Sequence, residues 1–238
     1  MLIARIVTAL VLAAALLAGL FLLSAEYFSL ALLPIMLIAA DEWCRLAGWQ
    51  RPLLRGLFAL ALSGLLVVAS HWLGGGWLLL DYSAVDPARV AWVVQAAALL
   101  WAVILLWIQG YPSSALLWAR WPVMALLGLA LLAATWLSIV FIIQLPSGRW
   151  WLLLAIAAVA FADVGGYAFG RWLGVHKLAP VISPGKTWQG YGGGLLANLL
   201  LALAVSAAVG LPLGQLTALL LAVAAAAPVG DLFESMLK

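Results

Sequence analysis

The sequence predicts an all-α, polytopic integral membrane protein with about eight transmembrane helices and both termini in the cytoplasm. Of its 238 residues, 68% are hydrophobic and only 8% are charged, and the mean hydropathy is +1.22. A soluble domain carries roughly 25% charged residues, so this composition excludes a soluble globular domain, a disordered chain and a coiled coil. The apolar residues also form continuous runs, whereas the strands of an outer-membrane barrel alternate apolar and polar residues.

Eight apolar runs, each bounded by charged residues, glycine or proline, account for the predicted helices. A helix needs about 20 residues to cross a bilayer. The runs are residues 6–23, 27–40, 56–73, 90–108, 122–143, 150–169, 195–210 and 215–229. The second run is short, so it is either a thin span or a hairpin partner that does not cross fully. The last run is also short and begins with the polar Gln215, so the pattern defines its ends only loosely.

The distribution of lysine and arginine predicts the orientation, because cytoplasmic loops of membrane proteins are enriched in these residues. If the N-terminus is cytoplasmic and all eight runs cross, only Arg89 and Arg149 lie on the opposite side. The cytoplasmic side then holds Arg5, Arg45, Arg51, Arg55, Arg120, Arg171, Lys177, Lys186 and Lys238. This asymmetry supports an even number of spans.

Asp163 is the first residue that indicates chemistry. It lies within the otherwise apolar run 150–169, where a carboxylate costs about 3 kcal/mol on insertion scales and is therefore expected to face a polar interior. The alternative is an interhelical hydrogen bond that only fixes packing. Gly166, Gly170 and Gly174 follow at four-residue spacing, which is typical of a helix face that another backbone approaches closely.

The cytoplasmic segment 171–190 has the composition of a phosphate-binding loop. Its cations and hydroxyls include Arg171, Lys177, Ser183, Lys186 and Thr187. The glycines 192–194 then open the next predicted helix. Cations, hydroxyls and backbone N–H groups near a helix N-terminus are the groups that bind phosphate. An ordinary cytoplasmic loop explains the positive charge, but it does not explain Ser-Pro-Gly-Lys-Thr beside a glycine-rich helix start.

A second polar group lies at the end of the chain. If the last helix continues, Asp231, Glu234 and Ser235 share one face, because they are spaced at i, i+3 and i+4. The two carboxylates predict a site for Mg²⁺ or another hard divalent cation, which takes one or two carboxylates together with substrate phosphate oxygens. The alternative is a charged helix end that marks the membrane interface.

These residues together resemble the signature of the phosphatidate cytidylyltransferase (CDP-diacylglycerol synthase) family. The matching motifs are Asp163-x-x-Gly-Tyr-x-x-Gly-Arg-x-x-Gly, Lys177-Leu-x-Pro-x-Ile-Ser-Pro-x-Lys-Thr-Trp-x-Gly and Gly230-Asp-Leu-x-Glu-Ser-x-x-Lys. A weaker match is Glu42-Trp-x-Arg-Leu-x-Gly, after the second run. The order, the spacing and the helical context of the C-terminal motifs all agree with that family.

The resemblance implies a membrane-embedded nucleotidyltransferase of phospholipid biosynthesis, in the bacterial inner (cytoplasmic) membrane. It would convert CTP and phosphatidic acid to CDP-diacylglycerol and pyrophosphate, with Mg²⁺ or another hard divalent cation as cofactor. CTP, phosphatidic acid and the lipid bilayer are the implied partners, no nucleic acid is expected, and a homodimer is an open alternative to a monomer. Competing interpretations are a non-catalytic or truncated paralogue of this family and, less favoured, a lipid kinase or a transporter.

The resemblance also implies roles for individual residues. Asp163, Lys186 and Asp231 would be catalytic, and Asp231 and Glu234 would bind the metal. Substrate-binding residues would be Arg171, Lys177, Ser183, Thr187, Gln189, Ser235 and Lys238. Residues 1–120 would form a scaffold of N-terminal transmembrane helices. Residues 121–238 would form the catalytic half, with the cytoplasmic motif loop 170–194.

The chain departs from the family pattern at three internal positions and at its end. The family usually has Thr or Ser at the position of Val164, Lys at that of Gly185 and Glu at that of Gln189. Gln keeps the hydrogen-bonding shape of Glu and loses its charge. The family signature also continues past the position of Lys238, with at least one further acidic residue and a last membrane helix. We therefore expect the catalytic half, residues 121–238, to be truncated at its end. Residues 1–238 alone are then expected to insert into the membrane and not to turn over.

The Lys and Arg distribution generates a topological prediction. A reporter fused at Ser147 should lie outside the cytoplasm, and a reporter fused at Gly185 should lie inside it, because one predicted span separates the two sites. Alkaline phosphatase and fluorescent-protein fusions measure this directly. If both reporters lie on the same side, the number of spans between them is wrong.

Overall fold

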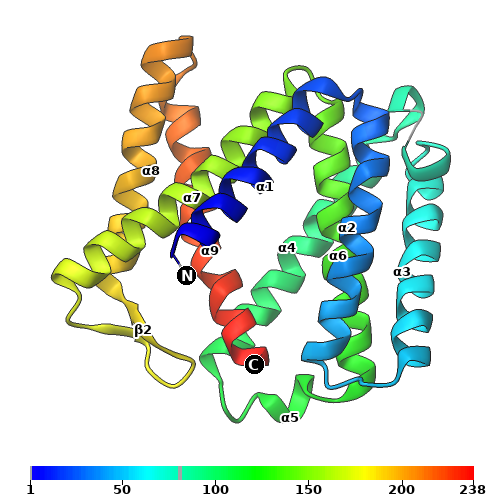
Figure 1. Cartoon of the computed structure of the whole chain (residues 1–238), viewed down its shortest axis with the longest axis horizontal. Helices are drawn as coiled ribbons and strands as arrows, with labels where there is room; N and C mark the ends of the chain where they lie inside the picture. Colours follow the sequence, from blue (N-terminus) through cyan, green and yellow to red (C-terminus); the bar gives the residue numbers. More distant parts are fainter. Residues whose placement is uncertain (1, 80–81) are drawn as a thin grey trace. The chain divides into compact units, whose positions relative to one another are not determined.

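The computed structural model describes residues 2–79 and 82–238 and is almost entirely helical (Figure 1). The long helices are α1 (Leu2–Leu22), α2 (Ala25–Leu46), α3 (Pro52–Trp72), α4 (Pro87–Gln109), α6 (Trp121–Gln144), α7 (Gly148–Leu173), α8 (Trp188–Val209) and α9 (Leu213–Leu237). The short elements are η1 (Trp77–Leu79), η2 (Tyr82–Ala84), α5 (Ala115–Trp118), β1 (Lys177–Ala179) and β2 (Ser183–Thr187). The predicted all-α membrane fold is therefore confirmed.

Seven of the described helices, α2, α3, α4, α6, α7, α8 and α9, are long and apolar enough to cross a membrane. Leu10–Leu22 in α1 forms a shorter apolar stretch, and the side chain of Arg5 lies outside the described residues. Helix α2 has 22 residues, so the run 27–40 underestimates it. The reason is that charged residues such as Asp41 and Arg45 continue the helix beyond its apolar part. The count of eight spans and the position of the termini stay predictions.

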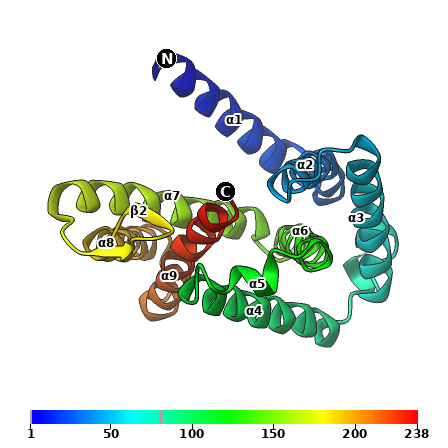
Figure 2. The same ribbon diagram turned by 90° about the horizontal axis from the view of Figure 1, so that it is seen from below.

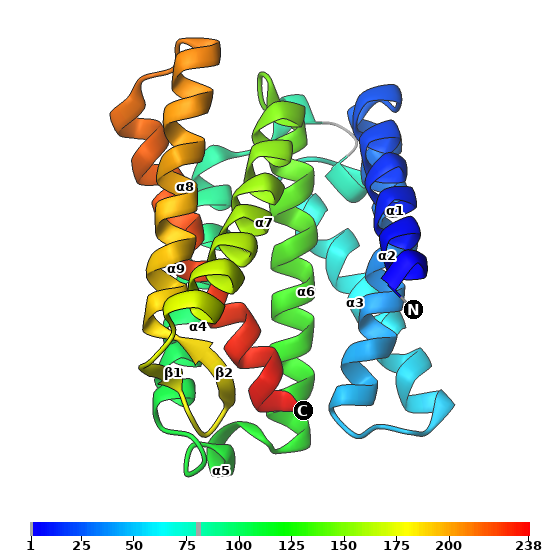
Figure 3. The same ribbon diagram turned by 60° about the vertical axis from the view of Figure 1, so that its left-hand side comes forward.

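The chain forms two compact units. We call Met1–Leu100 with Ala119–Trp151 the N-terminal unit, and Trp101–Trp118 with Leu152–Lys238 the C-terminal unit. In the N-terminal unit, α6 packs against α2 and α3, and α2 packs against α3 (Figure 2). In the C-terminal unit, α8 and α9 run side by side, and the hairpin β1–β2 lies at the end where α7 meets α8 (Figure 3).

The packing of α2 on α6 depends on one tryptophan and one glycine. Trp43 of α2 is buried, and its indole Nε1–H donates a hydrogen bond to the Met124 carbonyl oxygen of α6 at 3.0 Å. The ring lies over Gly128, where a Cβ would stand 2.6 Å from Trp43 Cδ1. The missing side chain therefore makes room for the indole, and the hydrogen bond satisfies its only polar group.

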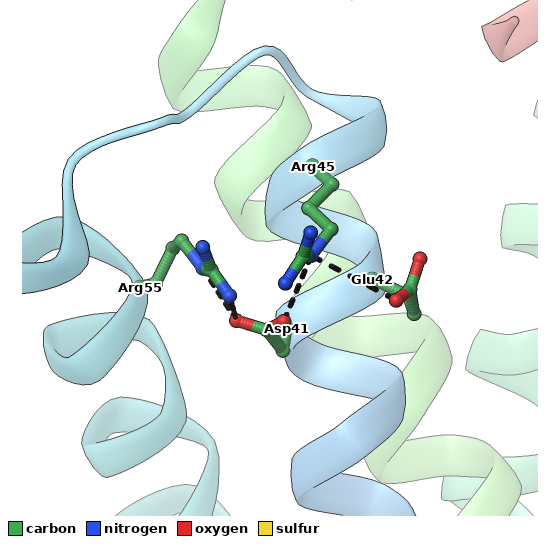
Figure 4. A network of polar contacts seen from close by, with 4 residues as sticks. All are labelled: Asp41, Glu42, Arg45 and Arg55. Atoms are coloured by element: carbon green, nitrogen blue, oxygen red, sulfur yellow. Dashed lines mark hydrogen bonds and ion pairs between the residues drawn. The ribbon is translucent and has the colours of Figure 1, made fainter.

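A network of four charged side chains joins the end of α2 to the start of α3 (Figure 4). One oxygen of the Asp41 carboxylate accepts from Arg45 Nε at 2.9 Å, and the other accepts from Arg55 of α3. Glu42 adds a longer contact of 3.7 Å to Arg45. Because both Asp41 oxygens are occupied, this carboxylate holds the α2–α3 connection in place.

Arg149 connects the start of α7 to the end of α1. Its guanidinium donates to the Leu23 carbonyl at 3.0 Å and to the Phe21 carbonyl at 3.4 Å. These carbonyls belong to the last turn of α1 and its exit, where a helix has no internal donors left. Four long helices, α2, α3, α4 and α6, separate these two ends in the sequence. If each of these four helices crosses the membrane, the two ends lie on the same side.

The segment predicted as one loop, 170–194, contains regular structure. Helix α7 continues to Leu173, and two antiparallel strands follow with Lys177 opposite Thr187 and Ala179 opposite Ser183. Helix α8 then begins at Trp188, so the glycines 192–194 lie inside it and do not open it. The physical reason is the cap at Thr187, whose hydroxyl accepts the Gly190 N–H at 3.1 Å and starts the helix early.

Helices α7 and α8 cross with their backbones in close approach. A Cβ at Gly190 would lie 2.7 Å from the Gly166 carbonyl oxygen, and one at Gly194 would lie 2.8 Å from the Ala162 carbonyl oxygen. One turn further along, the fully buried Asn198 donates to the Ala158 carbonyl at 3.0 Å. The predicted glycine face of α7 therefore has a partner face on α8, and small residues on both permit the crossing.

The Trp43–Gly128 contact generates a prediction about stability. Gly128→Ala should lower the free energy of unfolding by about 1–3 kcal/mol, because the new methyl group overlaps the indole ring and forces it to shift. Thermal unfolding of the purified protein in detergent, followed by near-ultraviolet circular dichroism, measures the change. Gly64→Ala is the matched control, because nothing lies within 4 Å of a Cβ at this helical glycine. Equal stability of the two variants would contradict the packing argument.

Candidate active site

A cavity of about 340 Å³ lies in the C-terminal unit among α7, the hairpin, α8 and α9. We call it the polar cavity, because acidic and basic side chains lie in its wall. Its walls are formed by Ala162, Asp163, Gly166, Tyr167, Gly170, Arg171, Leu178, Gly185, Lys186, Thr187, Gly190, Tyr191, Gly194, Ala224, Pro228 and Asp231. The structure thus brings together five residues that the sequence analysis predicts as functional: Asp163, Arg171, Lys186, Thr187 and Asp231. They come from three different elements, α7, β2 and α9, which only the fold brings into one place.

Lys186 and Asp231 form an ion pair inside this cavity. The Lys186 ammonium of β2 donates to the Asp231 carboxylate of α9 at 2.5 Å. The lysine side chain is 26% exposed and the aspartate side chain 52% exposed, so the aspartate stays accessible from the cavity. The pair ties the hairpin to α9, and it also holds a cation and an anion where a charged ligand can separate them.

Asp163 supplies a second carboxylate to the cavity. It lies on α7 beside the glycine face and opens to the cavity, as expected for a carboxylate in an apolar helix. The cavity therefore has two acidic side chains on different helices, Asp163 and Asp231. Among residues 2–79 and 82–238, no cluster of three His, Cys, Asp or Glu side chains is arranged to hold a metal ion.

Arg171 is held in the cavity wall by Tyr167, a motif residue to which the sequence pattern assigned no role. Its guanidinium donates to the Tyr167 hydroxyl at 2.9 Å, one helical turn earlier on α7. The i, i+4 spacing of a tyrosine and an arginine was the available signal in the sequence. Arg171 lies on the helix, and not in a loop, because α7 extends to Leu173.

Thr187 and Gln189 are both engaged by the protein itself. The buried Thr187 hydroxyl caps α8, as described above. The Gln189 side-chain oxygen accepts from the backbone N–H groups of Val175 and His176, both at 3.2 Å. Its amide nitrogen lies 2.9 Å from His176 Nδ1. Gln189 does not line the polar cavity, so these contacts support a role in holding the hairpin base.

Five further predicted residues are not among those that line the polar cavity. Lys177 and Ser183 lie on the two strands of the hairpin, whereas Glu234, Ser235 and Lys238 lie on the last turns of α9 or at its end. Glu234 is paired with Lys238 at 2.6 Å. Of the predicted metal pair Asp231 and Glu234, only Asp231 lines this cavity, and metal binding by the pair stays a prediction. The second carboxylate beside Asp231 in this cavity is Asp163.

Pro228 contributes a feature that the sequence pattern did not reveal. It lies inside α9 and lines the cavity together with Ala224, one turn earlier. Proline has no N–H, so it cannot donate the usual helical hydrogen bond to the Ala224 carbonyl. The wall of the cavity thus includes a break in the hydrogen-bond ladder of α9.

A second, mainly apolar cavity of about 490 Å³ adjoins the polar one. The two cavities share Leu178, Tyr191 and Pro228. The remaining walls are formed by Leu105, Ile108, Gln109, Tyr111, Ala179, Pro180, Val181, Ile182, Trp188, Ala225, Val229 and Leu232. A ligand with a charged head and an apolar tail therefore finds matching surroundings on the two sides of these shared residues.

Known proteins similar to this chain are cytidylyltransferases. The family model described as "Cytidylyltransferase family" matches residues 3–238. A phosphatidate cytidylyltransferase of Pseudomonas aeruginosa is 36% identical over 192 residues, which cover 80% of this chain and 65% of that protein. One from Haemophilus influenzae is 33% identical over 205 residues, covering 83% of this chain and 70% of that protein. The chain thus spans about two thirds of the length of these relatives.

Shorter similarity extends to more distant bacteria. A phosphatidate cytidylyltransferase of Staphylococcus epidermidis is 40% identical over 93 residues, or 38% of this chain. No solved structure matches the chain. The family model covers nearly the whole sequence, and two relatives more than 30% identical align with at least 80% of it. The chain therefore belongs to the cytidylyltransferase family.

Proposed function

We propose that this protein transfers a cytidylyl group from CTP to phosphatidic acid, which yields CDP-diacylglycerol and pyrophosphate. Membership of the cytidylyltransferase family supports the reaction type, and the names of the relatives support the lipid substrate. The observation that carries the proposal is the pair of adjoining cavities in the C-terminal unit. A polar cavity with both signs of charge meets an apolar cavity across Leu178, Tyr191 and Pro228.

The polar cavity suits phosphate groups. Lys186 and Arg171 provide two cations, of which Arg offers a planar array of donors and Lys a compact charge. The cavity also lies at the N-terminal end of α8, where the helix dipole favours an anion. The phosphates of CTP and of the lipid would therefore lie between the hairpin, α7 and the start of α8.

The cavity also fits a hard divalent cation. Mg²⁺ is held in proteins by one or two carboxylates and completes its octahedral shell with water and substrate phosphate oxygens. Asp163 and Asp231 offer two such carboxylates in one cavity. When bound, the ion would neutralise charge on the phosphates. Asp231 would first release Lys186 and bind the metal instead. Lys186 would then be free to bind a phosphate.

The proposed reaction forms one P–O bond and breaks another. A phosphate oxygen of phosphatidic acid attacks the α-phosphorus of CTP, and the bond between that phosphorus and the oxygen bridging to the β-phosphate breaks. Pyrophosphate leaves with the electron pair of the broken bond. The side chains of this site contribute alignment of the two substrates and neutralisation of the charge that develops on the leaving group. Lys186 and Arg171 are the residues placed to do so.

The cellular setting follows from the relatives and the helices. We place the protein in the inner (cytoplasmic) membrane of a bacterium, because the relatives are bacterial and the helices are long enough to cross a bilayer. Both proposed substrates could then reach the cavities, since CTP would arrive from the cytoplasm and phosphatidic acid from the bilayer. A homodimer is testable by crosslinking in membranes, and no nucleic acid takes part in the proposed reaction.

The role of Lys186 generates a prediction about turnover. In the protein encoded by the natural gene, Lys186→Ala should lower kcat at least about 100-fold, because one charge-stabilising contact in a transition state is worth roughly 3–4 kcal/mol. Conversion of labelled CTP to CDP-lipid measures this, with pyrophosphate release scored in parallel. Arg120→Ala is the control, because Arg120 is an exposed cation of the N-terminal unit. Wild-type turnover of Lys186→Ala would contradict a catalytic role of Lys186 and indicate that the hairpin is an ordinary basic segment.

The two carboxylates generate a prediction about the metal. Asp163→Asn and Asp231→Asn should each lower activity at least about tenfold and raise the Mg²⁺ concentration needed for half-maximal rate, because each removes a charged oxygen ligand. Glu234→Gln should leave that Mg²⁺ concentration unchanged, since Glu234 pairs with Lys238 and does not line the cavity. Titration of activity with Mg²⁺ distinguishes the variants. A larger Mg²⁺ requirement for Glu234→Gln than for Asp163→Asn would instead support Asp231 and Glu234 as the ligand pair.

A further inference from the structure

The base of the β1–β2 hairpin is closed by four polar contacts. The Trp188 N–H, at the start of α8, donates to the His176 carbonyl at 2.9 Å. The Gln189 side-chain oxygen accepts the N–H groups of Val175 and His176 at 3.2 Å each. The Gln189 amide nitrogen contacts His176 Nδ1 at 2.9 Å. One side chain thus joins the first turn of α8 to the backbone that leads into β1.

The contacts of Gln189 determine which atoms donate. Backbone N–H groups can only donate, so the side-chain oxygen must face Val175 and His176. The amide nitrogen is then the atom that faces His176 Nδ1, and an NH₂ group can only donate. Nδ1 must therefore be the acceptor. The imidazole of His176 accordingly carries its proton on Nε2, and all the polar atoms of Gln189 are engaged by the protein.

We propose that Gln189 is a positioning residue, which closes the base of the hairpin, fixes the tautomer of His176 and thereby holds Lys186 over the polar cavity. This proposal deepens the proposed function and rests on it only for its effect on turnover. Gln189 contacts neither the cavity nor another predicted site residue, and it acts through the strand that carries Lys186.

The path from Gln189 to Lys186 is short. Lys177 opens β1 directly after His176 and lies opposite Thr187 of β2. Lys186 precedes Thr187 and reaches Asp231 on α9 at 2.5 Å. If the base opens, the strand pair loses its fixed end, and Lys186 is held only by the remaining strand pairing and by its contact with Asp231. A displacement of about 1 Å at a catalytic group can cost about 100-fold in rate.

The proposal distinguishes the effects of leucine and glutamate at this position. Gln189→Leu has similar size and makes no hydrogen bonds, so the base opens. Gln189→Glu keeps an oxygen for the two backbone N–H groups, and its second oxygen requires a donor from His176. The neutral imidazole can supply that donor by moving its proton from Nε2 to Nδ1. The glutamate variant therefore keeps the hairpin closed and reverses the tautomer.

A spin label tests the closure without any measurement of activity. Val181 lies in the exposed turn of the hairpin, and Cys44 is the only cysteine, so Val181→Cys in a Cys44→Ala background gives one labelling site. We expect Gln189→Leu to add a mobile component to the electron paramagnetic resonance spectrum. Gln189→Glu and the control Gln215→Leu, which alters an exposed glutamine at the start of α9, should leave the spectrum unchanged. An unchanged spectrum for Gln189→Leu would overturn the proposal.

Nitrogen-15 spectra test the tautomer. The chain has two histidines, so His71→Gln leaves His176 as the only imidazole. We expect Nε2–H in the protein with Gln189 and Nδ1–H in Gln189→Glu. A proton on Nδ1 in the protein with Gln189 would overturn the assignment. This measurement also uses folded protein only, and its outcome does not depend on the reaction that the protein catalyses.

Turnover distinguishes positioning from substrate contact. If Gln189 positions Lys186, Gln189→Leu lowers kcat at least about tenfold with little change in KM for CTP, and Gln189→Glu stays within about threefold of the original rate. A large rise in KM for CTP in Gln189→Glu, with an immobile label, would show direct contact with the nucleotide and overturn the proposal. These rates are measured in the protein encoded by the natural gene. If that protein releases no pyrophosphate from CTP and phosphatidic acid, the proposed function fails, while the label and tautomer results still decide the role of Gln189.

Discussion

The close backbone crossing of α7 and α8 is the constraint on which the rest of the site depends. Small residues meet at four-residue intervals along both helices, from Asn198 against Ala158, through Gly194 against Ala162, to Gly190 against Gly166. In a membrane, where apolar side chains gain nothing by leaving lipid, such contact gives van der Waals packing and supplies acceptors for the Asn198 amide N–H groups. Any side chain larger than hydrogen at Gly190 or Gly194 would force the helices apart.

That crossing explains where the charged groups lie. Asp163 is the neighbour of a contact residue on α7, so it projects beside the crossing into the polar cavity. The hairpin leaves α7 and returns to α8 at the end of the same crossing, which places Lys186 close enough to reach Asp231 of α9. A carboxylate in an apolar helix and a basic cytoplasmic segment are thus parts of one site, because the two helices that bear them cannot separate.

Sequence patterns predicted the positions of the helices and several of the cavity residues. They predicted less well which atoms each side chain contacts. Apolar runs located all the long helices, because bilayer thickness imposes a length that hydropathy reveals. The pattern missed the hairpin, since two strands of 3 and 5 residues have no periodicity to detect. It also gave no sign that Gln189 contacts His176 or that Glu234 pairs with Lys238 in the absence of ligand. Spacing along the chain defines a face of a helix, but pairing depends on atoms that only the fold brings together.

The contacts divide the motif residues into those that hold the site and those that face the cavity. The Thr187 hydroxyl caps the start of α8, and the Gln189 side chain hydrogen-bonds to the base of the hairpin. Asp163 opens to the cavity, and in the proposed function the Lys186–Asp231 pair would be exchanged for a metal ion and a phosphate. Because both side chains of the pair are partly exposed, water screens their attraction, so such an exchange costs little. The same two charges that tie the hairpin to α9 in the absence of ligand would thereby be available to bind it.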